Sequence, residues 1–215
     1  MTTRIVLFGH GRLGREIAAL APDRDAAIVA TFGRDSHPSA NELLAVRADI
    51  AIDVSVADAV AGHVDVCLAA RLPIVVGVTG WQDGIDGAVR LCTELGGGML
   101  IAPNFSVGAV LFSAAVAHAA RSFSASLGFD AVLIESHHAA KKDAPSGTAR
   151  QLAAAARHAR GSEVPVTSVR VGHIPGTHAL VLDAPFEQVT LTHEARDRRV
   201  FADGALRAAR WMIGR

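Results

Sequence analysis

The chain has 215 residues, half of them apolar and a fifth charged, which indicates a globular protein with a sizeable buried core. Its 21 basic and 21 acidic side chains cancel, so no overall positive field exists to hold nucleic acid or an anionic membrane, and we expect neither as a partner. Two cysteines are too few for a disulfide framework, and no apolar run approaches the roughly 20 residues of a membrane span. The N-terminus shows no signal-peptide pattern either, so we expect a cytoplasmic protein.

The first half of the chain alternates short apolar runs with helical spacing of apolar residues. The apolar runs predict strands at 4–9, 26–32, 49–56, 73–80 and 99–104. The helical spacing predicts helices at 10–21, 58–72 and 84–95. Strands that alternate with helices form a doubly wound parallel sheet with right-handed crossovers. The expected fold class is therefore α/β, with a Rossmann-type sheet that binds ligands beyond the carboxyl ends of its strands.

A glycine pattern, Gly9-x-Gly11-x-x-Gly14, connects the first strand to the first helix. Gly9 permits the tight turn, Gly11 lets the backbone approach a pyrophosphate, and Gly14 lets the helix pack against the strand. The N–H groups at the helix start then face the phosphates. The pattern indicates a dinucleotide site; a tight turn without a ligand is the alternative that the sequence leaves open.

The end of the second strand indicates which dinucleotide binds. An acidic residue there holds a ribose 2′-hydroxyl, whereas an arginine accommodates a 2′-phosphate. The sequence reads Gly33-Arg34-Asp35: Gly33 leaves space, Arg34 can bind a phosphate, and Asp35 argues mildly for the hydroxyl. We expect NADPH to be preferred and leave NADH open as a second cofactor. A solvated loop cation is the alternative for Arg34.

In the second half of the chain, strand and helix patterns no longer alternate regularly. Helical patterns cover 107–123, 146–160 and 203–214, and strand patterns cover 129–138, 167–174, 177–184 and 187–195. The long helix 107–123 carries apolar residues on most faces, so we expect it to be largely buried. The order predicts a smaller α+β domain with a mixed open sheet at 104–199. Residues 1–103 and 200–215 are then expected to form the dinucleotide-binding domain.

The stretch "ESHHAAKKDAPSGTA" at 135–149 holds unusually dense chemistry. Ser146 is the expected N-cap of a helix, where Gly147 and Thr148 present backbone N–H groups that suit a carboxylate or phosphate. Lys141 adds positive charge just before this helix. Strand alternation sends His137 and its neighbour to opposite sides, so one imidazole can serve as a proton donor near neutral pH. The stretch indicates an anionic small molecule beside an acid–base group.

The same stretch resembles the E-x-H-H-x-x-K-x-D-A-P-S-G-T-A signature of the dihydrodipicolinate reductases, also called 4-hydroxy-tetrahydrodipicolinate reductases, of bacterial lysine and diaminopimelate synthesis. Further similarities are "GHGRLG" (9–14), "GVTGW" (77–81), "APNFSVG" (102–108), "RVGHIPGTH" (170–178) and the closing segment 191–212. The resemblance covers nearly the whole chain.

The resemblance implies NAD(P)H-dependent reduction of a cyclic imine dicarboxylate in a homotetramer built through the open sheet of the second domain. It implies that His137 is the general acid and that Lys141 stabilises charge in the transition state. The residues it assigns to a substrate carboxylate are His138, Ser146, Gly147 and Thr148. Those it assigns to the cofactor are Gly9, Gly11, Arg12, Leu13 and Gly14 at the phosphates, and Gly77, Thr79, Ala102, Asn104 and Phe105 at the nicotinamide.

The chain departs from the family in being compact, in carrying Gly33 where an acidic residue is usual, and in having short strands in the second domain, which leaves a dimer open. We expect no metal, because no H-x-x-x-H or C-x-x-C pair is present. Glu135 is given no chemical role, His178 a structural one, and His63 a packing or surface one. Two other functions stay open: an amino-acid dehydrogenase acting on a different imine, and a cofactor-binding sensor without chemistry.

Overall fold

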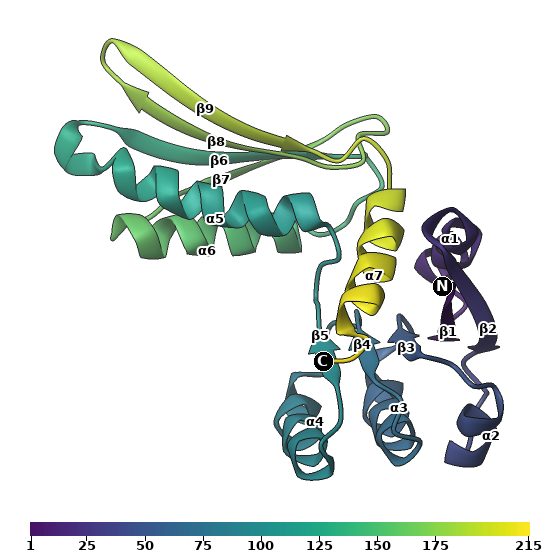
Figure 1. Cartoon of the computed structure of the whole chain (residues 1–215). Helices are drawn as coiled ribbons and strands as arrows, with labels where there is room; N and C mark the ends of the chain where they lie inside the picture. The colour runs from purple at the N-terminus through teal and green to yellow at the C-terminus, as the bar shows by residue number, and fades with distance from the viewer. The chain divides into compact units, whose positions relative to one another are not determined.

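The computed structural model describes all 215 residues, and the chain divides into two compact units. The first unit joins Met1–Phe105 to Arg199–Arg215, and the second is Ser106–Arg198. These bounds lie within two residues of the domain limits expected from the sequence. Figure 1 draws both units in chain order from purple to yellow.

The first unit contains a five-stranded parallel sheet with the strand order β2-β1-β3-β4-β5. Its strands are β1 (Thr3–Phe8), β2 (Ala26–Phe32), β3 (Ile50–Asp53), β4 (Ile74–Val76) and β5 (Met99–Ile101). Its helices are α1 (Arg12–Leu20), the short 3-10 helix Ala21–Arg24, α2 (Ala40–Ala45), α3 (Ala57–Ala69), α4 (Gln82–Leu95) and α7 (Arg199–Met212). The order confirms the Rossmann-type α/β class expected from the sequence.

The sheet is buried on both faces, which explains its unbroken apolar runs. In β1, Ile5 and Leu7 pack into one core with α1 and α7, while Val6 and Phe8 pack into a second core with α3 and α4. All four side chains are fully buried. A strand that is buried on both sides reads as a continuous apolar run rather than an alternating one. Figure 1 shows α1 and α7 over one face of this sheet and α3 and α4 over the other.

One helix of the first unit, α2, was not predicted. Ser39 caps it: the Ser39 hydroxyl accepts a hydrogen bond from the Glu42 N–H, and the Glu42 carboxylate accepts one from the Ser39 N–H. This reciprocal pair is a capping box, so the signal was present as Ser-x-x-Glu. The helix is too short for apolar periodicity to reveal it. The structure also shortens the predicted strands β3, β4 and β5 and begins α7 at Arg199 rather than at 203.

The second unit is a four-stranded mixed sheet with the order β7-β6-β8-β9. Its elements are α5 (Val107–Ser122), the 3-10 helix Ala125–Leu127, β6 (Asp130–His137), α6 (Gly147–Arg160), β7 (Val166–Arg170), β8 (Thr177–Ala184) and β9 (Glu187–Glu194). Strands β6 and β7 are parallel, and the other pairs are antiparallel. The α5 and α6 helices lie along one face of the sheet (Figure 1).

The two faces of this sheet differ. Leu133, Leu180 and Leu182 are fully buried beneath α5 and α6. On the opposite face, Ile134 and Val169 are 36% and 38% exposed. Because directly paired residues share a face, the register places Ala179 next to Ile134 there. This second face carries a partly exposed apolar surface.

The expectation that the helix at 107–123 is largely buried is wrong for this chain. Val107, Val110 and Leu111 of α5 are 45%, 56% and 65% exposed, and only four residues of the helix are buried. The reason is that α5 packs against α6 and the sheet along one stripe only. None of the helices is both long and apolar enough to span a membrane.

Candidate active site

The glycine turn between β1 and α1 has the geometry that a pyrophosphate requires. Gly9 adopts a left-handed φ of +100°, and a Cβ atom there would lie 2.7 Å from the Val54 carbonyl oxygen. A Cβ atom at Gly14 would lie 2.1 Å from the Gly9 carbonyl oxygen, so α1 can pack this closely only with glycine. Gly11 caps α1 without a side chain, which leaves the helix start open to an anion.

A cavity of about 310 Å³ lies beside this turn. Its walls are Gly9, His10, Gly11, Gly33, Arg34, Val54, Ser55, Val56, Ala59 and His63. The cavity brings Arg34, at the end of β2, to the same hollow as the glycine turn. A dinucleotide whose pyrophosphate lies at the start of α1 fits this arrangement, with its ribose toward the end of β2. Of the other residues assigned to the phosphates, Arg12 opens α1 and Leu13 packs against the core.

A buried polar network under this cavity was missed from the sequence. Asp53, at the end of β3, is fully buried, and its Oδ2 atom lies 2.8 Å from Nδ1 of His63 on α3. The Ser55 hydroxyl and backbone N–H both donate to Asp53 Oδ1, at 2.6 and 2.9 Å. The His63 ring stacks on Phe8 with 4.2 Å between centroids. His63 is therefore a buried partner of Asp53 that fixes the loop after β3.

The residues assigned to the nicotinamide follow β4 and β5. Gly77, Thr79, Ala102 and Asn104 lie at the carboxyl ends of these strands, and Thr79 is exposed. Phe105 is buried: a Cβ atom at Gly77 would lie 2.1 Å from the Phe105 ring. The Phe105 ring thus belongs to the core beneath the strand ends.

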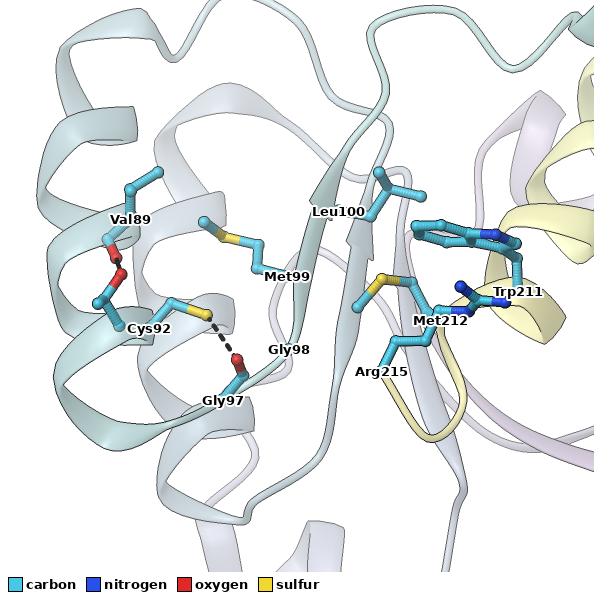
Figure 2. A pocket seen from close by; sticks show the side chains of 10 residues that line it. Val89, Cys92, Gly97, Gly98, Met99, Leu100, Trp211, Met212 and Arg215 are labelled. Atoms are coloured by element: carbon cyan, nitrogen blue, oxygen red, sulfur yellow. Dashed lines mark hydrogen bonds between the residues drawn. The ribbon is translucent and has the colours of Figure 1, made fainter.

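A second cavity of the first unit, about 410 Å³, lies at the edge strand β5 and is shown in Figure 2. Apolar side chains from α4, β5 and α7 line it, among them Met99 and Met212. The Cys92 thiol donates to the Gly97 carbonyl oxygen at 3.2 Å, and burial raises the pKa of that thiol. Arg215 stacks over Trp211 at 4.6 Å. No acid–base cluster faces this cavity, so it is a weaker candidate for a reaction site.

In the second unit, titratable groups meet at the end of β6. Glu135 is fully buried, and His137 is 7% exposed. The Glu135 Oε2 atom is hydrogen-bonded to His137 Nδ1, and Glu135 Oε1 lies 2.6 Å from the Arg170 guanidinium on β7. On β8, His178 is 5% exposed, and its ring contacts the His137 ring with 5.3 Å between centroids. Glu135 and His178, which the sequence left without chemistry, are therefore neighbours of the expected acid.

These contacts shift the pKa values of the cluster. Burial opposes ionisation of Glu135, but hydrogen bonds from Arg170 and His137 outweigh it and lower its pKa to about 2. Burial lowers the pKa of His137 below its ordinary value, although the Glu135 carboxylate acts in the opposite direction. Burial and the neighbouring His137 lower the pKa of His178 to about 4. At neutral pH the cluster therefore holds an ionised carboxylate beside two imidazoles that resist protonation.

The helix start next to the cluster confirms Ser146 as the N-cap of α6. The Ser146 hydroxyl accepts a hydrogen bond from the Ala149 N–H at 3.1 Å and lies 3.4 Å from His178 Nε2. Lys141 is half-buried and pairs with Asp143 at 2.7 Å. The charge on Lys141 also lowers the pKa of His137, so the two groups are electrostatic neighbours. His138, just beyond the end of β6, is half-buried.

Glu135, His137 and His178 also lie close enough to hold a metal ion, since their ligand atoms are within 4.8 Å of one another. Both carboxylate oxygens of Glu135 are already engaged, however, one by His137 and one by the Arg170 guanidinium. A cation would have to displace or face that guanidinium. The expectation that the site holds no metal stays a prediction.

The first unit is of the Rossmann type and carries a glycine turn, and the second carries a carboxylate–histidine pair beside a helix start. This combination is typical of two-unit oxidoreductases that use a nicotinamide cofactor. The sequence profile for "Dihydrodipicolinate reductase, N-terminus" matches residues 3–105, and that for "Dihydrodipicolinate reductase, C-terminus" matches residues 108–215. The chain belongs to the dihydrodipicolinate reductase family.

Individual relatives agree with the family profile. The chain is 38% identical to the 4-hydroxy-tetrahydrodipicolinate reductase of Gluconobacter oxydans and 34% identical to that of Acidiphilium cryptum, over 95% of this chain and 89% of each relative. Its fold is similar to that of dipicolinate-bound dihydrodipicolinate reductase from Paenisporosarcina sp. TG-14, with a TM-score of 0.84 at 23% identity over 99% of this chain and 95% of that one. Aspartate dehydrogenase from Thermotoga maritima has a more distant fold, with a TM-score of 0.53 at 9% identity over 98% of this chain and 96% of that one.

Proposed function

We propose that the chain reduces 4-hydroxy-tetrahydrodipicolinate to tetrahydrodipicolinate in lysine and diaminopimelate biosynthesis, with a nicotinamide as hydride donor. The observation that carries the proposal is the arrangement at the end of β6. There the acid candidate His137, the cation Lys141 and the start of α6 gather in one unit of a chain whose two halves both match the reductase family.

The start of α6 is the site for a substrate carboxylate. Gly147 and Thr148 present backbone N–H groups at the positive end of the helix, and Ser146 fixes that end as its N-cap. His138 lies at the head of the same loop. Lys141 pairs with Asp143, and a dicarboxylate would compete for its ammonium group. The substrate is thus a small diacid, bound as either the hydroxylated ring or its dehydrated form.

The chemistry divides between cofactor and chain. When bound, the nicotinamide supplies the hydride that reaches the substrate ring. The hydroxyl group of the substrate leaves with a ring hydrogen as water, and the dehydrated ring accepts the hydride. His137 delivers the accompanying proton from its imidazolium form, and Lys141 offsets the negative charge that develops on the ring. The residues Gly9, Gly11, Arg12, Leu13 and Gly14 hold the cofactor phosphates. Gly77, Thr79, Ala102 and Asn104 form the nicotinamide side, and the buried ring of Phe105 supports it from beneath.

We propose NADPH as the preferred cofactor, with NADH as a weaker one. Arg34 and Gly33 line the cavity beside the glycine turn, where a 2′-phosphate needs a cation and space. Replacement of Arg34 by alanine should raise the KM for NADPH while leaving that for NADH nearly unchanged. An unaltered ratio of the two constants in Arg34→Ala would contradict this assignment.

We propose that the enzyme assembles as a homotetramer, with a dimer as the alternative, through the uncovered face of the second sheet. The partly exposed Ile134 and Val169 on that face support an interface between copies. We also propose the cytoplasm as its compartment, where the free thiols of Cys67 and Cys92 would stay reduced.

The test is NADPH oxidation with freshly generated 4-hydroxy-tetrahydrodipicolinate. His137→Gln and Lys141→Ala should each lower turnover by about a hundredfold or more, because each removes a positioned proton donor or charge stabiliser. The matched controls His158→Gln and Lys142→Ala change exposed residues of the same types and should keep wild-type turnover. Pyridine-2,6-dicarboxylate, a planar diacid, should inhibit competitively.

The outcomes separate the alternatives. Full activity in both site variants would contradict the residue roles, and a wild-type protein that leaves NADPH unoxidised would contradict the reaction. An amino-acid dehydrogenase would instead reduce NADP⁺ with an amino acid. A sensor would bind the cofactor without turnover.

A further inference from the structure

Glu135 occupies an unusual position for a carboxylate. It lies near the carboxyl end of β6, an inner strand of the second sheet, on the face covered by α5 and α6, and is fully buried. The register sets it beside Ser168 on β7 and His178 on β8. A buried carboxylate is costly unless it is paired, so its partners should explain its presence.

Both oxygens of Glu135 are engaged. Oε1 accepts hydrogen bonds from the Arg170 guanidinium at 2.6 Å and from the Ser146 backbone N–H at 3.4 Å. Oε2 is bonded to His137 Nδ1. Arg170 in turn donates to the Asp143 carbonyl oxygen at 2.5 Å, which anchors the guanidinium. The carboxylate therefore links strand β6, strand β7 and the N-cap of α6.

This arrangement determines which nitrogen of His137 carries a proton. A guanidinium-bound carboxylate whose pKa is about 2 is ionised at neutral pH and can only accept hydrogen bonds. Nδ1 of His137 must therefore be the donor, so Nε2 is the atom that gains and loses a proton. A Cβ atom at Gly176 would lie 3.0 Å from that Nε2 atom, so a larger residue there would crowd this edge of the ring.

The charges around His137 give Glu135 a second effect. Arg170 on β7, Lys141 in the loop after β6, and burial each disfavour the imidazolium form. His178 on β8 contacts the ring and resists protonation itself. Among the groups that act on His137, only the Glu135 carboxylate favours the charged form.

We propose that Glu135 is a positioning residue for the reduction. It holds His137 through Nδ1, keeps Nε2 as the proton-transferring atom, and stabilises the imidazolium form of the ring. Arg170 fixes the carboxylate for this purpose. The proposal rests on the proposed function in taking His137 as the acid. A purely structural Glu135 would influence stability and leave the pH dependence of turnover alone.

The pH profile of Glu135→Gln tests this role. Loss of the negative charge lowers the pKa of His137 further, so the limb on which kcat falls with rising pH should move to lower pH. We expect kcat near pH 7 to drop about tenfold or more and to recover toward the wild-type value as the pH is lowered, with KM little changed. The control Glu187→Gln makes the same change at an exposed site at the opposite end of β9 from His193, and should keep the wild-type profile. If kcat falls with rising pH over the same pH range in Glu135→Gln and in wild type, the proposal is overturned.

A measurement on the unmodified protein keeps the proposal testable if Glu135→Gln does not fold. NMR of protein labelled with ¹⁵N-histidine, with the His137 signals assigned by their loss in His137→Gln, reports the tautomer of the neutral ring. A proton on Nδ1 supports the proposal, and a proton on Nε2 overturns it. This result is independent of turnover, whereas failure of wild-type protein to oxidise NADPH would refute the proposed function alone.

Discussion

At the scale of single residues, the cluster around His137 shows what a local pattern can and cannot reveal. The stretch from 135 to 149 made His137 and Lys141 candidates and predicted the N-cap Ser146, because their spacing is local. It did not give Glu135 a role, since Arg170, which binds its carboxylate, lies 35 positions away on another strand. The Asp53–His63 pair was missed for the same reason, because the residues belong to a strand and a helix. Contacts of this kind depend on register and packing, which periodicity does not specify.

The buried histidines predict a loss of stability in mild acid. The pKa of His178 is about 4 when folded, below its ordinary 6.5, so the unfolded chain takes up its proton first as the pH falls. The stabilising contribution is complete above pH 6.5 and is lost between about 6.5 and 4, on the order of 3 kcal/mol in all. Burial lowers the pKa of His137 and His193 in the same direction.

Amide hydrogen exchange of β6 and β8, corrected for the intrinsic pH dependence of exchange, measures this loss. Tryptophan fluorescence cannot, because Trp81 and Trp211 both belong to the first unit. The protection lost between pH 7 and pH 4.5 should be smaller in His178→Gln than in wild type. Equal losses in the two proteins would contradict the prediction.

At the scale of whole elements, the long periodic segments were predictable and their ends were not. The helices α3, α4, α5 and α6 and the strands β1, β2 and β8 lie where apolar spacing placed them. The short strands β3, β4 and β5 end earlier than their apolar runs, because the residues that follow belong to the rim of the sheet rather than to its ladder. Burial of α5 was overestimated, since the apolar composition of a helix does not show how much of its surface other elements cover.

The packing of α7 can be tested by one substitution made in two helices. A Cβ atom at Gly204 of α7 would lie 1.7 Å from the Phe105 carbonyl oxygen, whereas one at Gly87 of α4 would meet nothing within 4 Å. Gly204→Ala should therefore destabilise the first unit by about 1–3 kcal/mol through overpacking. Gly87→Ala should stabilise it by up to about 1 kcal/mol, because alanine is the better helix former.

Denaturant unfolding followed by tryptophan fluorescence reports this unit, since both tryptophans lie in it. Opposite signs for the two variants are the expected result. A gain in stability from Gly204→Ala would mean that α7 does not pack against Phe105 as described.

At the scale of the whole molecule, the uncovered face of the second sheet predicts association. Ile134 lies at the centre of that face, between Thr167 of β7 and Ala179 of β8. Lysine at this position would put a charge into an apolar interface, where an unpaired charge is costly. Ile134→Lys should sediment as a smaller species than wild type at the same concentration.

The matched control is Leu44→Lys, which places the same charge on an exposed apolar site of α2 in the first unit and should leave the sedimentation coefficient unchanged. If wild type and Ile134→Lys sediment alike, the sheet face is not the interface.

We propose that His137 and Lys141 act on a diacid held at the start of α6 against a bound nicotinamide. The most direct measurement is a crystal structure with NADPH and pyridine-2,6-dicarboxylate. We predict a carboxylate of the diacid on the N–H groups of Gly147 and Thr148, with His137 Nε2 and the Lys141 ammonium facing its ring and the nicotinamide stacked on the opposite side. A diacid bound elsewhere, or one beyond reach of His137, would contradict this proposal.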